Sequence, residues 1–181
     1  MKAWLELPGV RFAGAEIWIH WSVLAAVSFL LCMSLKSPIH AVVAISSYLG
    51  IIVIHEMGHA FAVRRLGYGV GAISIGFLHG VCEYEPPRSE RDFVLIAWSG
   101  VLAQLAVAIP VLVLAAALPD ADFGYLSPAI AFLGYVNLVV ALFNLAPAPG
   151  FDGEIAWRVI PLMLRKRLGP RKRPRNLQRR R

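Results

Sequence analysis

The sequence predicts an all-α polytopic membrane protein with about four transmembrane helices, a short membrane-associated β-hairpin between the second and third, a C-terminal interfacial helix and a basic tail. Three observations favour this class. Charged residues make up only 16% of the 181 residues and apolar residues 58%, whereas about 25% of an average soluble protein is charged. Uncharged segments recur and reach 26 residues at 93–118. Glycines and strand-like alternation interrupt the helical pattern at 66–92. A soluble all-helical protein is the alternative, but its uncharged segments would be shorter.

The net charge of +7 comes from the end of the chain. Residues 165–181 hold ten Lys and Arg and no acidic residue, so residues 1–164 carry a net charge of −3. We therefore expect a membrane-embedded core at 1–164 with no nucleic-acid-binding surface. The tail at 165–181 is expected to be disordered, cytoplasmic and attracted to anionic lipid. The two cysteines, Cys32 and Cys82, are read as ordinary thiols because they form neither a disulfide framework nor a metal-binding pair.

The first two spans are predicted at 17–35 and 39–63. Residues 17–35 are 19 residues without a charge, about the length that crosses a bilayer as a helix. Trp18 and Trp21 stand near the start of this segment, where membrane proteins carry aromatic belts. Pro38 follows in a short connection, and the second span ends before Arg64 and Arg65.

The rest of the core follows in order. Alternating residues at 72–75 and 81–85, with glycines between them, predict a β-hairpin over 70–85. The third span is predicted at 93–118 and the fourth at 125–146, both without a charged residue. Residues 153–164 are too few to span a membrane and fit an interfacial helix.

A metal-binding pattern stands in the last third of the second span. His55, Glu56 and His59 form the sequence His-Glu-x-x-His. On a helix, residues four apart lie on one face, so both imidazoles can bind one ion while Glu56 takes a proton from bound water. Neutral imidazoles and a carboxylate are the usual ligands of catalytic zinc, so one Zn²⁺ per chain is expected.

The break after the fourth span offers a further ligand. Pro147, Pro149 and Gly150 end the helix, and Asp152 follows directly. The unwound chain can turn this carboxylate back toward the membrane interior, where irregular backbone is tolerated only if it lines protein or a wet cavity. The alternative is that Asp152 caps the next helix.

The charge distribution predicts the orientation. Four spans put both termini on one side together with seventeen of the eighteen Lys and Arg, leaving Lys36 alone on the other. The positive-inside rule makes that side cytoplasmic. The expected location is therefore the plasma (inner) membrane of a prokaryote. His55, His59 and Asp152 then lie at one depth, in the cytoplasmic leaflet.

Taken together, these motifs resemble the site-2 protease family of intramembrane zinc metalloproteases. The resemblance rests on His55-Glu-Met-Gly-His59, on the small-residue segment 97–104, and on Asn144-Leu-Ala-Pro147 followed by Phe151-Asp-Gly153. It implies Asp152 as the third zinc ligand, Glu56 as the catalytic acid and base, Asn144 near the site, and a membrane-embedded hairpin. The chain departs from the family pattern in Ser99-Gly-Val101, with Gln104 at an amide position, and in Phe151 where Leu is usual.

The predicted function is hydrolysis of peptide bonds in or near transmembrane segments of membrane protein substrates. A strand edge at 72–84 would hold the unwound substrate. Ser99, Gln104, Asn137 and Asn144 would either line a water path or pack between helices. The alternatives are a non-proteolytic membrane protein that binds metal or a partner, a zinc transporter, and another metalloprotease class with Glu83 or Glu154 as third ligand.

Overall fold

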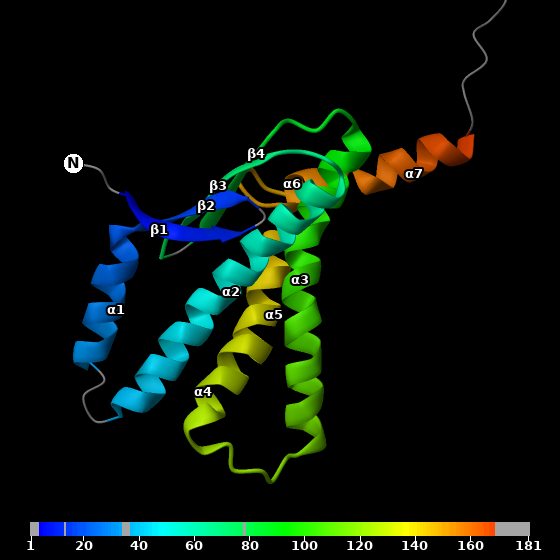
Figure 1. Ribbon diagram of the computed structural model, residues 1–181. Helices are drawn as coiled ribbons and strands as arrows, with labels where there is room; N and C mark the ends of the chain where they lie inside the picture. The colour runs from blue at the N-terminus through cyan, green and yellow to red at the C-terminus, as the bar shows by residue number, and fades with distance from the viewer. Residues whose placement is uncertain (1–3, 13, 34–36, 78, 169–181) are drawn as a thin grey trace, which may run out of the picture.

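The computed structural model describes residues 4–12, 14–33, 37–77 and 79–168. A bundle of long helices carries a four-stranded sheet at one end (Figure 1). The strands are β1 (Trp4–Phe12), β2 (Ala15–His20), β3 (Val70–Ile75) and β4 (Gly80–Tyr84), and the first helices are α1 (Trp21–Met33), α2 (Pro38–Arg65) and α3 (Glu90–Ala117). The chain continues through η1 (Gly124–Leu126), α4 (Ser127–Ile130), the π-helical η2 (Ala131–Val136) and α5 (Asn137–Asn144) to α6 (Gly153–Ala156) and α7 (Val159–Leu168).

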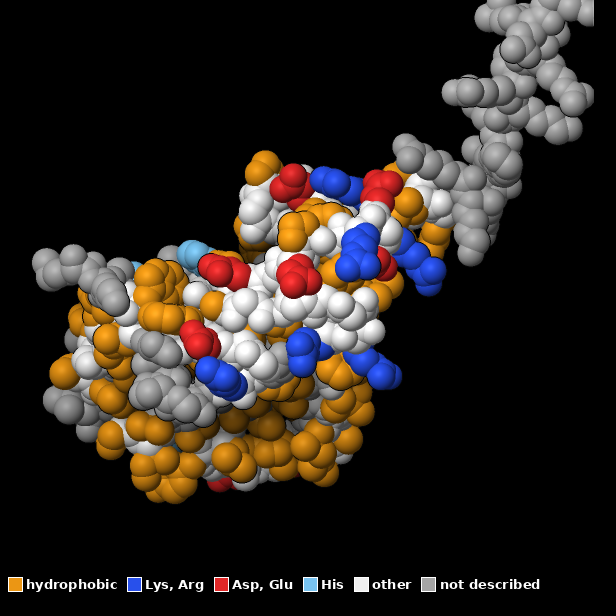
Figure 2. Space-filling model, turned by 45° about the horizontal axis from the view of Figure 1, so that its top comes forward, with side chains coloured by type: hydrophobic (Ala, Val, Ile, Leu, Met, Phe, Trp, Pro, Cys, Tyr) orange, Lys and Arg blue, Asp and Glu red, His pale blue; other side chains and the backbone are white. Residues whose placement is uncertain are grey.

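Within these residues, three helical segments are long and apolar enough to cross a membrane: Pro38–Arg65, Glu90–Ala117 and Gly124–Asn144. They correspond to the second, third and fourth predicted spans. The third begins earlier than predicted because Ser89 caps it by accepting a hydrogen bond from the Asp92 backbone N–H at 3.1 Å. Figure 2 shows charged side chains gathered toward the sheet end of the molecule and hydrophobic side chains covering the opposite part of the face in view.

The prediction of a continuous helix over 17–35 is wrong. Residues 17–20 belong to β2, and α1 begins only at Trp21. The 13 residues of α1 extend about 20 Å, less than the roughly 30 Å of a hydrocarbon core. Ile17 instead pairs with Ile73 in a parallel ladder between β2 and β3, so its backbone groups are satisfied by a strand far away in sequence.

The predicted hairpin is present as the antiparallel pair β3–β4. It is half of a sheet ordered β1-β2-β3-β4 rather than an isolated hairpin, so the all-α prediction needs correction. β1 and β2 are also antiparallel, with an irregularity in register between Glu6 and Arg11. The predicted interfacial helix at 153–164 divides into α6 and α7, and α7 continues to Leu168. Residues 169–181 of the predicted tail lie outside the described residues.

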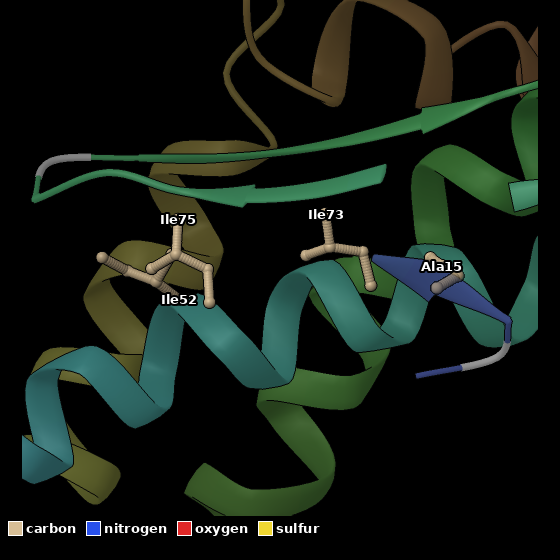
Figure 3. Close-up of a cluster of buried hydrophobic side chains, with 5 residues drawn as sticks. Ala15, Ile52, Ile73 and Ile75 are labelled. Atoms are coloured by element: carbon tan, nitrogen blue, oxygen red, sulfur yellow. The ribbon is translucent and has the colours of Figure 1, made fainter. Parts of the chain in front are cut away.

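The sheet packs on α2 through a small apolar core. Ile52 of α2 lies against Ile73 and Ile75 of β3, with Ala15 of β2 beside them (Figure 3). This contact fixes the hairpin above the middle of α2, over the residues that carry the metal-binding pattern.

The helices α2 and α3 approach each other closely at Gly58. A Cβ atom at this position would lie 2.5 Å from the backbone oxygen of Ser99 and 2.9 Å from Cα of Gly100. Any side chain there would force the helices apart, so Gly58 sets the distance between α2 and α3.

Candidate metal centre

His55 and His59 lie on consecutive turns of α2 and point to the same place. Their Nε2 atoms are 3.0 Å apart. Oδ2 of Asp152 lies 3.2 Å from Nε2 of His55 and 3.3 Å from Nε2 of His59. In tetrahedral coordination by zinc, ligand bonds of about 2.0–2.1 Å place two ligand atoms about 3.3 Å apart. The three side chains therefore have the spacing of metal ligands.

The hydrogen bonds of the two imidazoles support this interpretation. Nδ1 of His59 donates to the backbone oxygen of Ile96 at 2.8 Å, and Nδ1 of His55 lies 3.0 Å from Oε1 of Gln104. Both partners are acceptors, so each neutral imidazole carries its proton on Nδ1 and presents a lone pair at Nε2. Three acceptor atoms with no proton between them then converge, an arrangement that a bound cation stabilises.

Asp152 supplies the negative charge of this group. Burial raises the pKa of its carboxyl, but positive charge on the side where His55 and His59 lie outweighs burial and lowers that pKa to about 2. Oδ2 is buried and has no hydrogen-bond partner among the described residues. Asp152 precedes α6, but its side chain makes no capping hydrogen bond. The structure therefore favours the ligand interpretation over the capping alternative.

The segment that carries Asp152 is attached to the bundle by two tryptophans. Nε1 of Trp157 donates to the backbone oxygen of Leu145 at 2.6 Å, and Nε1 of Trp98 donates to that of Ala156 at 3.0 Å. Their rings are in edge-to-face contact at 5.8 Å. These contacts hold the segment after α5 against α3, and thus fix the position of Asp152 relative to the histidines.

Glu56 is buried beside the three ligands, and only 4% of its surface is exposed. It lines the same cavity of about 330 Å³ as His55, His59 and Asp152. Its side chain lies directly over Gly80 at the start of β4, where a Cβ atom would come within 2.5 Å of Cγ and 2.6 Å of Oε1. The absence of a side chain at residue 80 therefore makes the space that Glu56 occupies.

The absence of a side chain at Gly100 on α3 likewise makes space for His55 and His59. A Cβ atom there would lie 2.5 Å from Nε2 of His59 and 2.7 Å from Cε1 of His55. The sequence marked Gly80 and Gly100 as a helix breaker and a small packing residue, but it gave no signal that each faces a reactive side chain. His79 and Tyr84 also line the cavity.

Cys82 also lines the cavity, from β4. Burial, reinforced by the charges of Glu56 and Glu83, raises the pKa of its thiol to about 12. Nucleophilic attack requires the thiolate, which a raised pKa disfavours at neutral pH, so Cys82 fits the ordinary thiol that the sequence indicated. Glu83 and Glu154, the alternative third ligands, are exposed and are absent from the ligand group formed by the described residues.

Gln104 and Asn144 both lie beside His55, as expected for residues near the site. Gln104 is fully buried, and Nδ2 of Asn144 lies 3.4 Å from both Nδ1 of His55 and Oε1 of Gln104. The other two candidates for a water path have packing contacts. Asn137 donates to the Gln104 backbone oxygen at 3.0 Å, and Ser99 donates to that of Ile96. Neither belongs to the cavity wall as the structure describes it.

We predict that Gln104→Leu weakens metal binding by about tenfold or more, because the Nδ1 proton of His55 loses its acceptor and the imidazole loses its orientation. The measurement is competition for zinc with a chromogenic chelator in detergent solution. Gln104→Glu keeps an acceptor oxygen at this position and should retain most of the affinity. Equal affinity in wild type and Gln104→Leu would show that the contact does not orient His55.

Comparison with known proteins gives two findings and one negative result. The chain is 29% identical over 166 residues to a Mycobacterium tuberculosis protein named "Putative zinc metalloprotease Rip3". The match covers 81% of this chain but only 41% of that relative. The fold is similar to the solved structure of a site-2 protease from Methanocaldococcus jannaschii, with a TM-score of 0.66 and 22% identity over 88% of this chain and 72% of the other. No family model matches. The first finding agrees with the resemblance that the motifs indicate, and the second shows a similar fold.

Proposed function

We propose, with the site-2 protease fold as the premise, that this chain is an intramembrane zinc metalloprotease that cleaves peptide bonds in or near transmembrane segments of membrane proteins. One observation carries the proposal. One nitrogen each of His55 and His59 and one oxygen of Asp152 converge 3.0–3.3 Å apart beside the buried carboxyl of Glu56. The chain spans about two fifths of the length of the relative it matches.

The residues of the chain have distinct roles in this reaction. A zinc ion held by His55, His59 and Asp152 would polarise the substrate carbonyl and lower the pKa of a water molecule to near 7. Glu56 accepts the proton of the attacking water and delivers it to the leaving amide nitrogen. Gln104 keeps His55 oriented through the contact at Nδ1. A purely structural metal site would need only the three ligand residues and not Glu56.

The substrate is proposed to bind as an extended strand along β4. In the sheet order β1-β2-β3-β4, β3 is paired on both sides, whereas β4 has one free edge among the described strands. Gly80, Cys82 and Tyr84 of β4 also line the cavity. A transmembrane helix that unwinds near the cavity can satisfy its backbone groups by adding to this edge. This restricts the predicted binding edge at 72–84 to β4.

We place the sheet end of the molecule on the cytoplasmic side of a prokaryotic plasma membrane. Both ends of the described chain, β1 and α7, lie at the sheet end (Figure 1), and Arg64 and Arg65 end α2 there. The basic residues at 165–181 would then meet anionic lipid on that side.

The two other function classes are distinguishable. A zinc transporter needs several sets of metal ligands along a path through the membrane. The described residues contain a single group that could hold a metal ion. A non-proteolytic binding protein would have no need of the buried acid at Glu56.

The experiment that tests the function uses the purified chain in proteoliposomes with a membrane-spanning model substrate. We expect cleavage at a site within or next to the spanning segment, located by mass spectrometry. A zinc chelator should abolish cleavage and added zinc should restore it. Metal-dependent substrate binding without cleavage would support the binding protein, and zinc flux across the vesicle membrane would support the transporter.

A second prediction concerns Gly80. We expect Gly80→Ala to reduce cleavage by about tenfold or more, because the new methyl group displaces Glu56 from its place beside the ligands. Zinc content should remain unchanged, since the three atoms nearest to a Cβ at residue 80 all belong to Glu56, which is not one of the proposed ligands. The measurements are initial cleavage rate and metal content of the purified variant.

Gly71→Ala is the matched control, with the same substitution in the same hairpin. A Cβ atom at Gly71 would meet its nearest neighbour at 3.6 Å, an ordinary contact distance, so this variant should cleave at the wild-type rate. Equal rates for Gly80→Ala and Gly71→Ala would contradict the assigned role of Gly80.

A further inference from the structure

A second hollow lies on the face of α2 and α3 that is turned away from the candidate metal centre. Its volume is about 750 Å³ and it shares no lining residue with the metal-site cavity. We call it the α2–α3 groove, and its α2 wall is formed by residues at helical spacing: Ile54, Met57, Gly58, Phe61, Ala62 and Arg65. Because the α2–α3 groove is separate from the metal-site cavity, its occupant need not take part in hydrolysis.

The floor of the α2–α3 groove is made of small residues, and its walls are made of large apolar ones. Gly58 and Ala62 on α2 stand beside Ser99 and Ala103 on α3. Phe61 projects from one wall with 61% of its surface exposed, and Leu102 projects from the other with 55% exposed. An apolar chain lying on this floor would contact both walls.

The length of the groove matches one leaflet of a membrane. Ile54 and Arg65 are eleven positions apart on one continuous helix, which corresponds to about 16 Å along its axis. Half of a hydrocarbon core is about 15 Å. The groove therefore extends from the charged end of α2 to about the middle of the bilayer.

Arg65 is the charged residue at the mouth of the groove, and it is exposed. The ion pairs formed by the described residues do not include it, and the lining contains no acidic residue. A guanidinium group binds phosphate through two parallel charge-assisted hydrogen bonds. An apolar groove of leaflet length with an unpaired guanidinium at the headgroup level has the chemistry of a phospholipid site.

We propose that the α2–α3 groove binds one anionic glycerophospholipid, with an acyl chain on the small-residue floor and the phosphate at Arg65. The main alternative is a transmembrane helix of a second copy, because small residues four apart also favour helix association. The lipid is the better occupant because it brings an anion to Arg65, whereas an apolar helix would leave the guanidinium unpaired.

The test uses the full chain purified in detergent and titrated with dimyristoyl phosphatidylglycerol, with bound lipid counted by native mass spectrometry. Arg65→Gln should weaken lipid binding by about fivefold. Arg64→Gln is the matched control, because the guanidinium of Arg64 lies beside Gly14 and outside the groove. It should bind the lipid within twofold of wild type. An equal loss in both variants would indicate general surface charge and overturn the proposal.

A second variant tests the acyl-chain part of the site. Ala62→Leu fills the floor and should weaken lipid binding to a similar extent, while zinc content and substrate cleavage, which depend on the opposite face, stay unchanged. Wild-type lipid affinity in Ala62→Leu would overturn the proposal. So would formation of a disulfide-linked dimer by Phe61→Cys in a Cys32→Ser background in vesicles, because the exposed native thiol is then absent and the link would place a second copy in the groove.

Discussion

Replacing Glu56 with Gln is expected to slow cleavage of a transmembrane substrate by about 10²–10⁴-fold, with zinc content unchanged. The amide has nearly the same shape as the carboxylate and fits the same space over Gly80. It cannot accept a proton from the attacking water, and residue 56 does not belong to the ligand group at the metal centre. The loss should therefore appear in the rate of the chemical step rather than in metal binding.

The measurements are single-turnover cleavage in proteoliposomes and metal analysis of the same preparation. Glu154→Gln provides the control, because Glu154 is an exposed acid outside β4, the proposed substrate-binding strand, and it should cleave normally. Wild-type cleavage by Glu56→Gln would exclude the hydrolytic mechanism proposed for Glu56.

The second large effect is expected for Asp152→Ala, which removes one of the three proposed ligand atoms. Loss of an outer hydrogen-bond partner typically weakens metal binding by about 10–100-fold, so loss of a direct ligand should exceed about 100-fold. Cleavage should become undetectable at ordinary zinc concentrations. The two histidines would remain, but without the charge that Asp152 brings to the group.

Glu154→Ala is the appropriate comparison, since it removes an exposed carboxyl two residues away and should retain zinc and activity. Zinc affinity is measured by chelator competition in both variants. If Asp152→Ala kept full affinity, another residue would have to serve as third ligand. A loss of zinc in Glu154→Ala would identify that residue.

The arrangement of His55, His59 and Asp152 was predictable because two local rules act together. Helical periodicity places the two histidines on one face. The proline-interrupted segment after the fourth span then returns Asp152 at the same end of the bundle. The first inference needs only residues that are close in sequence, and the second needs only the number of membrane spans between the histidines and Asp152. The structure brings the same three residues together.

Strand β2 could not be predicted in the same way. Ile17, Trp18 and Ile19 are as apolar as a transmembrane helix requires, and nothing local distinguishes the two states. What decides is the parallel pairing with β3, more than fifty residues away. Because the pairing partner is distant, the apolar run alone gave the wrong element.

The individual contacts of residues on α3 could not be predicted from the sequence, although Gln104 was expected near the site. Ser99 and Gln104 are five residues apart, so they face different directions on a helix. Only the positions of α2 and α5 show that Gln104 faces His55 and that Ser99 faces the α2–α3 groove. The same holds for Gly80 and Gly100, whose close neighbours come from another element.

The distance along the chain between the histidines and Asp152 has a consequence for biosynthesis. The ligands from α2 are made about a hundred residues before the one that follows α5. At about 5–20 residues per second, that interval is about 5–20 s. During this time the nascent chain holds only two of the three ligand residues. Trp157, which fastens the last segment to Leu145, is made later still. The centre can therefore be completed only after synthesis has passed the fourth predicted span.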